Sequence, residues 1–223
     1  MLRKFTFFAT KLGLVALALF GCQSEQSEAG GIAYTIDDLT GTQLTNPPFT
    51  LGFQFNVNTS ISVTGLGVFD DTQNGLIDSY PIAIFDSAGV SLISSTVNSG
   101  TTDPLINQFR YSSVAPFALS PGLYYIGALY STGNDGLLGP GVATNFATSS
   151  EITFNQGGYA FGGTLSAPLN LVGTSPGYFG PNFTFTSASA TVPEPASLTM
   201  FGLGAVGLVA GAMRRRRQTK TLV

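Results

Sequence analysis

The feature that most constrains this chain is an uncharged, apolar run over residues 196–213, followed at once by four arginines. The run has no Asp, Glu, Lys or Arg. As a helix rising about 1.5 Å per residue it would span roughly 27 Å, enough to cross a thin hydrocarbon core. Arginines beside such a helix stay on the cytoplasmic side of the membrane. Residues 196–213 are therefore predicted to be a C-terminal transmembrane helix, and residues 218–223 a short cytoplasmic tail. The arginines that fix this topology are Arg214, Arg215, Arg216 and Arg217.

A second apolar run, residues 12–21, lies near the N-terminus and follows three basic residues. A basic segment followed by a short apolar one is the layout of a secretory signal peptide. Ser27 and Ala29 are the small residues that a signal peptidase prefers before its cleavage point. Residues 1–29 are therefore predicted to form a signal helix that is removed on export.

Cys22 is the only cysteine of the chain. It lies at the edge of the export segment, so the mature domain is expected to form no internal disulfide. Leu19-Phe20-Gly21-Cys22 loosely resembles a lipoprotein signal, in which the cysteine receives lipid after cleavage. Phe20 departs from the small residue usual at its position, and both cleavage points stay open.

The segment between the two apolar runs is strongly acidic. Residues 30–195 contain ten acidic residues and one basic residue, Arg110, a formal charge of −9 against −3 for the whole chain. Nucleic-acid binding needs clustered Lys and Arg to neutralise phosphate, so this composition excludes it. An acidic surface attracts divalent cations instead.

The composition also argues against catalysis. The chain has no histidine, and its one cysteine precedes the mature domain, so Ser-His-Asp, Cys-His and His-based metal sites are excluded. A pair of aspartates can hydrolyse glycosides, for example Asp70 with Asp103 or Asp135. Asp103 and Asp135 lie in turn-like contexts, however, which a loop role explains fully. The protein is predicted not to be an enzyme.

The middle of the chain reads as all-β. It is rich in Val, Ile, Phe, Tyr and Thr, is interrupted by Gly, Pro and Asn, and is almost free of Lys and Glu. Regularly spaced short strands of this kind predict an antiparallel, jelly-roll-like β-sandwich over residues 30–186, with a spacer over 187–191. The predicted strands are residues 51–57, 61–69, 80–86, 90–97, 108–114, 122–131, 142–146, 151–154, 159–163 and 182–186.

Three local patterns refine this prediction. Leu51, Phe53, Phe55 and Val57 alternate with polar or small residues, which buries one face of a sheet. In the next strand the alternation fails around Gly65 and Gly67, which indicates a bulge or a close backbone approach. Residues 86–89 read Asp-Ser-Ala-Gly between two apolar runs and predict a hairpin turn.

The most informative motif stands between the spacer and the apolar run. Val192, Pro193, Glu194 and Pro195 precede the helix and the arginine cluster. Two prolines keep a segment extended and accessible, while the helix holds it at the membrane surface. This three-part arrangement over residues 192–217 resembles the PEP-CTERM sorting signal, although an ordinary membrane anchor with a chance Pro-Glu-Pro is the alternative.

The resemblance implies a partner and a fate. In PEP-CTERM proteins the tail is recognised by exosortase, a membrane-embedded cysteine transpeptidase that is thought to cut near the motif and remove the helix. The middle segments, such as residues 51–55 and 63–70, also look like a β-sandwich domain of unknown function found in such proteins. The resemblance implies a fold and a location for this domain, and no specific activity.

One loop has a spacing that suggests calcium. Asp70, Thr72, Asn74 and Asp78 stand at positions one, three, five and nine of an EF-hand-like loop, with Gly at position six. Position twelve, which should close the coordination sphere with a carboxylate, is Pro81. The alternative is an acidic connection between strands, built on an Asn-Gly turn.

The remaining candidates have a structural and a binding interpretation. Arg110 is expected to form an ion pair with one of the acids, because an unpaired, partly buried guanidinium is costly; recognition of a carboxylate or a sugar is the alternative. The aromatic residues are expected mainly in the core, with a sugar-stacking surface as the minority interpretation. They are Tyr124, Tyr125, Tyr130, Tyr159, Phe161, Tyr178 and Phe179.

Together these observations predict an exported, non-enzymatic protein of the cell surface or of a biofilm matrix. Its expected partners are signal peptidase, exosortase, the inner membrane, in which it is transiently anchored, and exopolysaccharide. No cofactor is expected other than the calcium of the loop described above. The alternative function is an extracellular carbohydrate-binding module assisted by calcium.

Overall fold

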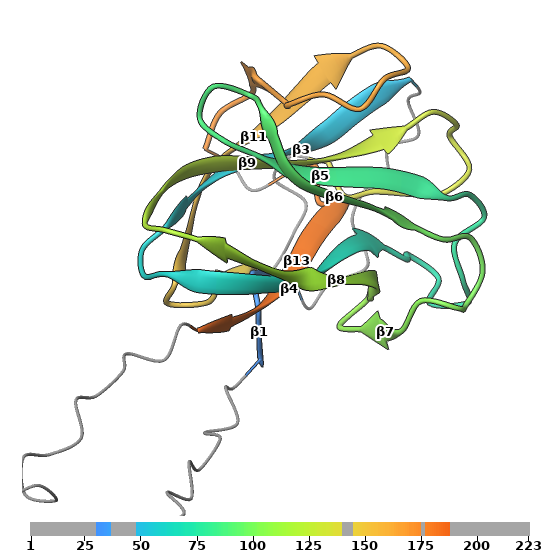
Figure 1. Ribbon diagram of the computed structural model, residues 1–223. Helices are drawn as coiled ribbons and strands as arrows, with labels where there is room; N and C mark the ends of the chain where they lie inside the picture. The colour runs from blue at the N-terminus through green and yellow to red at the C-terminus, as the bar shows by residue number, and fades with distance from the viewer. Residues whose placement is uncertain (1–29, 37–47, 140–144, 175–176, 188–223) are drawn as a thin grey trace, which may run out of the picture.

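Figure 1 shows a computed structural model of the chain, which describes residues 30–36, 48–139, 145–174 and 177–187. Within these residues the secondary structure consists of strands, and every strand pair is antiparallel. The expected all-β, antiparallel fold is confirmed. The two predicted terminal helices lie outside the described ranges, within which no helix suited to crossing a membrane is found.

The strands form two large sheets and one small one. The first sheet has the order β1 (Gly30–Ile32), β13 (Pro181–Ser187), β4 (Ile61–Phe69), β8 (Phe109–Leu119) and β7 (Leu105–Ile106). The second has the order β12 (Asn170–Leu171), β11 (Ile152–Phe161), β3 (Phe49–Val57), β9 (Gly122–Tyr130), β5 (Tyr80–Phe85) and β6 (Ser91–Val97). The small sheet pairs β2 (Tyr34–Thr35) with β10 (Ala147–Thr148).

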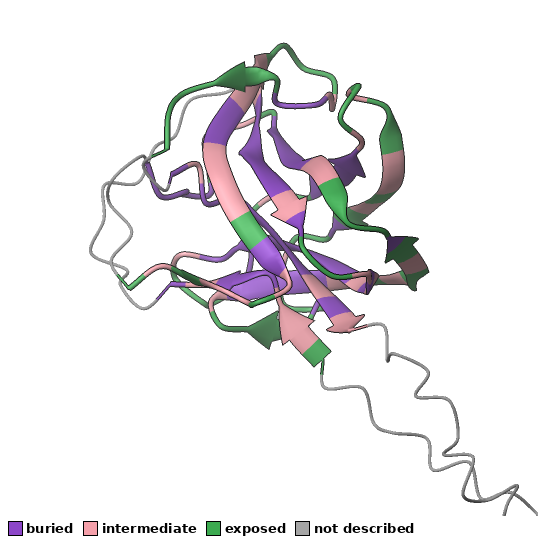
Figure 2. Cartoon of the chain, turned by 90° about the vertical axis from the view of Figure 1, so that its left-hand side faces the viewer, coloured by how far each residue is buried: buried purple, intermediate pink, exposed green. Residues whose placement is uncertain are grey.

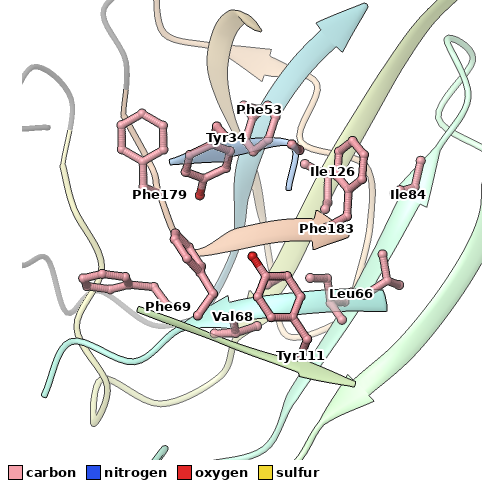
Figure 3. Packing of buried hydrophobic residues seen from close by; sticks show 14 of the residues in the cluster. Tyr34, Phe53, Leu66, Val68, Phe69, Ile84, Tyr111, Ile126, Phe179 and Phe183 are labelled. Atoms are coloured by element: carbon pink, nitrogen blue, oxygen red, sulfur yellow. The ribbon is translucent and has the colours of Figure 1, made fainter. Parts of the chain in front are cut away.

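The core lies between the two large sheets. On β3 the residues predicted to point inward are buried, and Phe55 meets Phe183 of the opposite sheet with 5.1 Å between ring centroids. Leu66 of β4 and Ile126 of β9 belong to the same buried cluster (Figure 3). The strands of both large sheets contain many of the buried residues, shown in purple in Figure 2. Two sheets that share one apolar core are the arrangement that a β-sandwich requires.

The irregularity predicted in the second strand is confirmed. In β4 the pairing with β8 shifts register between Val63 and Gly65. The pairing with β13 shifts at the corresponding point, between Thr184 and Phe185. Gly67 lies so close to the ring of Tyr111 that an added Cβ would come within 2.5 Å of it. The two glycines therefore mark a bulge and a close contact, as the broken alternation indicates.

The predicted hairpin between β5 and β6 is also confirmed. The Asp86 carboxylate accepts hydrogen bonds from the backbone N–H groups of Ala88 at 2.9 Å and Val90 at 2.8 Å. Gly89 has a φ of 83°, a conformation that glycine adopts at little cost. An aspartate that bonds its own turn and a glycine at positive φ together fix the register of the two strands.

Gly52 offers a direct test of this packing. It pairs with Gly127 across β3 and β9, and a Cβ at Gly52 would collide with the backbone carbonyl of Ile126. We expect Gly52→Ala to lower the free energy of unfolding by about 1–3 kcal/mol, because neither strand can move away. Gly163→Ala is the matched control, since nothing lies within 4 Å of a Cβ there. Urea titration of both variants measures the difference, and equal stability would contradict the described pairing.

Candidate functional site

The first and last strands that the structure describes lie next to each other. β1, the first described strand, pairs with β13, the last, so that Gly30 is opposite Thr186 (Figure 1). The hydroxyl of Ser187 donates a hydrogen bond to the Glu151 carboxylate at 2.8 Å. This bond, together with backbone hydrogen bonding, lowers the pKa of Glu151. The chain thus leaves the domain toward residues 192–217 from a fixed point beside its first strand.

Arg110 makes the ion pair expected of it, and its partner is Asp70. The Arg110 Nε lies 2.6 Å from the Asp70 Oδ2, and both side chains are buried. The same Asp70 oxygen accepts the backbone N–H of Gly75 at 2.9 Å. Asp70 stands directly after β4 and Arg110 is the second residue of β8, so the pair joins two neighbouring strands of the first sheet.

Arg110 also holds the loops on either side of this pair. Its Nη1 donates to the backbone carbonyl of Asp103 at 3.0 Å, and its Nη2 donates to that of Gln73 at 3.2 Å. The planar guanidinium can satisfy three acceptors at once in this way. A single buried cation therefore organises the loop after β4 and the loop before β7.

These contacts weigh against calcium in the loop that the spacing suggests. Asp70 faces the Arg110 cation, with which Ca²⁺ would have to compete. The Thr72 hydroxyl donates to the Asn74 side-chain oxygen at 2.7 Å, and Asp78 accepts from Thr132 and from Asn134. Within the described ranges, no group of three or more His, Cys, Asp or Glu side chains could hold a metal ion. The calcium site stays a prediction without support from the geometry.

Asp135 and Asp103 have the loop roles that their sequence contexts indicate. The Asp135 carboxylate accepts the backbone N–H groups of Ile77 and Asp78 and the hydroxyl of Tyr80, the last at 2.7 Å. Burial raises the pKa of Tyr80, and the hydrogen bond to Asp135 raises it further. The Asp103 carboxylate accepts the backbone N–H of Asn98 at 2.6 Å. Each of these carboxylates is bound by its own or a neighbouring loop.

The aromatic residues divide between the core and one end of β11. Tyr130 and Phe179 are buried between the sheets, as the core interpretation expects. Tyr125 is buried in a separate small cluster on the outer face of the second sheet, and Tyr124 is half-buried with its hydroxyl on the Ser120 carbonyl. The other three gather together. Tyr159 lies 5.0 Å from Phe161 and 6.4 Å from Tyr178 between ring centroids, and Phe161 is 69% exposed.

A shallow hollow lies beside the first strand. Its volume is about 320 Å³, and the buried Ser149 hydroxyl has no hydrogen-bond partner among the described residues. The residues that line it belong to β1, to the small sheet and to the position directly after β10, and they carry no charge: Gly30, Ile32, Thr35, Ala147, Thr148 and Ser149. With hydroxyls as their only polar groups and no carboxylate or amine, these side chains offer little to hold a cofactor.

Sequence reasoning missed one group of polar residues. Gln54 and Asn56 alternate with the buried Phe53 and Phe55. In the sequence analysis this alternation predicted which residues are in the core, and the polar residues between them were not considered. The polar half of the same pattern places these amides together on the opposite face of the sheet. Their partners on β11 come from residues about a hundred positions further on, which a local pattern does not identify.

The comparisons with known proteins concern the C-terminal tail. The family described as the PEP-CTERM protein-sorting motif matches residues 191–217, which include Pro193-Glu194-Pro195 and the arginine cluster. No curated protein and no solved structure matches the chain. The chain therefore carries the sorting motif of PEP-CTERM proteins. The motif indicates an exported protein that reaches the cell surface through the membrane and is a target of exosortase.

Proposed function

We propose that this protein is a non-enzymatic component of the bacterial cell surface or extracellular matrix. In this proposal signal peptidase removes residues 1–29, exosortase cuts near Pro195, and the inner membrane anchors the chain only until that cut. The observation that carries it is the PEP-CTERM motif at residues 191–217, which begins four residues after the end of β13. The mature product is then the β domain of residues 30–186 with a short spacer, built in our proposal as a jelly-roll-like sandwich.

The geometry of the chain ends supports this order of events. Because Gly30 and Thr186 are paired, both connections to the membrane leave from one corner of the domain. The domain can therefore fold completely on the outer side before either end is cut. Pro195 directly precedes the apolar run of residues 196–213, which keeps the cleavage point close to the membrane surface in this proposal.

The chemistry of the acidic residues supports a non-enzymatic role. Glycoside hydrolysis needs two carboxyl groups that face a shared space for the substrate. Asp70 is buried against Arg110, while Asp103 and Asp135 are bound by backbone N–H groups. Carboxylates bound in this way stabilise their loops, which supports a structural role for all three.

Substitution of the motif tests the proposal in the producing cells. We expect Glu194→Ala to leave an uncut precursor in the membrane fraction, because the residue lies in the tripeptide that exosortase is expected to read. Asp71→Ala removes an acid from the domain instead, where no side-chain hydrogen bond to Asp71 is described, and should be processed normally. Immunoblots of membrane and external fractions make the comparison. Normal processing of Glu194→Ala would contradict the proposal.

A second candidate is an extracellular carbohydrate-binding module. It is favoured by the uncharged amide residues on the outer face of the second sheet. The form of this candidate that relies on calcium near Asp70 and Asp78 has less support, because Arg110 already neutralises Asp70. A calcium titration separates the two forms, since a cation that binds the fold raises the melting temperature.

A further inference from the structure

Two pairs of amide side chains lie across strands β3 and β11, on the face turned away from the core. Gln156 Nε2 donates to Gln54 Oε1 at 3.4 Å, and Asn56 Nδ2 donates to Asn155 Oδ1 at 3.4 Å. Because residues alternate along β3 and Phe55 is in the core, Gln54 and Asn56 point to the outer face. We call Gln54, Asn56, Asn155 and Gln156 the amide row.

A β-bulge brings two consecutive residues of β11 into this row. The register with β3 shifts between Phe154, opposite Phe55, and Gln156, opposite Gln54, so that Asn155 is the extra residue. In a regular strand Asn155 and Gln156 would point to opposite faces. Here each contacts an amide of the same β3 face. Bulges of this kind re-aim side chains and are over-represented next to functional sites.

The row is held in place and keeps unused hydrogen-bonding groups. Gln54 is only 9% exposed, and its Nε2 lies 2.8 Å from the hydroxyl of the buried Tyr125. The two amide–amide contacts are longer than the usual 2.9–3.0 Å and are correspondingly weak. Each amide has two donors and one acceptor oxygen, so Asn56, Asn155 and Gln156, which are half-buried, retain groups for a ligand.

The row has a covered end and an open end. At one end the loop of residues 162–169 lies over the outer face, where Ser166 N–H donates to Thr50 Oγ1 at 3.2 Å and Leu165 packs near Tyr125. At the other end Asn58 Nδ2 donates to Thr153 Oγ1 at 3.0 Å, and both residues are exposed. Polar, uncharged side chains therefore continue from a buried amide out to solvent along two adjacent strands.

We propose that the amide row binds a neutral polysaccharide chain through its hydroxyl groups. A hydroxyl both donates and accepts hydrogen bonds, and amides offer both functions. The row contains no charged side chain, while residues 30–195 carry a formal charge of −9, which disfavours anionic polymers. The ligand class rests on the proposed function, since export is what brings the protein to such polymers.

Affinity electrophoresis of the exported protein, purified from the producing cells, tests the site. The gels contain dextran, a soluble β-glucan or galactomannan as neutral probes, and alginate as the anionic one. We expect at least one neutral polymer to retard the protein, and Asn155→Ala to weaken that binding at least tenfold. Asn170→Ala is the matched control, because Asn170 is an exposed amide of the same sheet outside the row. It should bind like the parent.

The remaining outcomes are also decisive. If Asn155→Ala alters the melting temperature, Thr153→Ala replaces it, because Thr153 is exposed next to the open end of the row, and it should weaken binding several-fold. The inference is overturned if no neutral polymer retards the protein, if alginate alone does, if Asn170→Ala loses as much affinity as Asn155→Ala, or if sedimentation shows that the amides pair two copies. Should the tail prove uncut, the full chain in detergent is used, so failure of the proposed processing is distinguishable from failure of the site.

Discussion

Above pH 10 the domain should lose stability at about 5 kcal/mol per pH unit and unfold within about three units. The cause is a set of four buried tyrosines in which burial raises the pKa of the phenol, namely Tyr34, Tyr80, Tyr111 and Tyr130. Each phenol that ionises only in the unfolded chain contributes about 1.4 kcal/mol per pH unit. Residues 30–195 contain no lysine and no histidine, so side chains other than tyrosine contribute little in this range.

The sign of the effect follows from proton binding. A raised pKa means that above pH 10 the folded state still holds phenol protons that the unfolded chain has released. The free energy of unfolding then falls as the pH rises, while below pH 10 the contribution of these groups is fully present. Circular dichroism against pH, together with tyrosinate absorbance, measures this transition. Gradual ionisation of all tyrosines without unfolding would contradict the burial described.

Tyrosine-to-phenylalanine variants distinguish unfolding caused by ionisation of the buried tyrosines from general alkaline damage to the chain. The hydroxyls of Tyr111 and Tyr130 are buried and have no hydrogen-bond partner among the described residues. We therefore expect Tyr111→Phe and Tyr130→Phe to preserve stability at neutral pH and to move the alkaline midpoint upward. Tyr124→Phe is the control for the substitution itself, because it removes a half-buried hydroxyl that has a hydrogen-bond partner, the Ser120 carbonyl.

Arg110→Met should lower the free energy of unfolding by about 3–5 kcal/mol. The substitution keeps much of the side-chain volume and removes the cation 2.6 Å from the buried Asp70. A buried charge left without its partner is far more costly than an intact pair is stabilising. The carbonyls of Asp103 and Gln73 also lose a donor. Denaturant titration measures the change.

The double variant Arg110→Met with Asp70→Asn isolates the charge. Asn keeps the shape of Asp70 and an oxygen for the Gly75 N–H, but leaves no buried negative charge. It should therefore be more stable than Arg110→Met alone, although both lack the same carbonyl contacts. A double variant that is as unstable as the single one would show that Arg110 acts through those carbonyls and not through the ion pair.

Strand positions were predictable where side-chain alternation or turn chemistry is strong. β4 has the predicted bounds, and β3, β5, β6 and β9 differ from theirs by at most two residues. β11 was predicted as two strands, because Asn155-Gln156-Gly157-Gly158 reads as a break. The structure has one strand there, since pairing with β3 continues through the bulge and beyond.

Other elements were invisible to pattern reasoning for physical reasons. β1, β7 and β12 have two or three residues, too few to show a period, and each pairs with a longer strand. β2 and β10 have two residues each and pair with one another. The predicted strand at residues 142–146 lies partly outside the described ranges, and Asn145 and Phe146 are not in a strand.

For the site residues, too, local patterns were predictable from the sequence and contacts between distant segments were not. A lone base among ten acids predicts an ion pair, but only the fold selects Asp70 as the partner of Arg110. The EF-hand-like spacing is local, and it carries no information about the guanidinium that the fold places beside its first residue. The amide row depends on contacts between residues 54–56 and 155–156, which are brought together by sheet topology alone.

The intact mass of the protein recovered from outside the producing cells tests the central claim most directly. Exosortase processing predicts a polypeptide that ends close to Pro195, without the apolar run of residues 196–213 and without the four arginines that follow it. A mass that includes every residue to Val223 would show that the tail is retained after export, and it would contradict processing by exosortase.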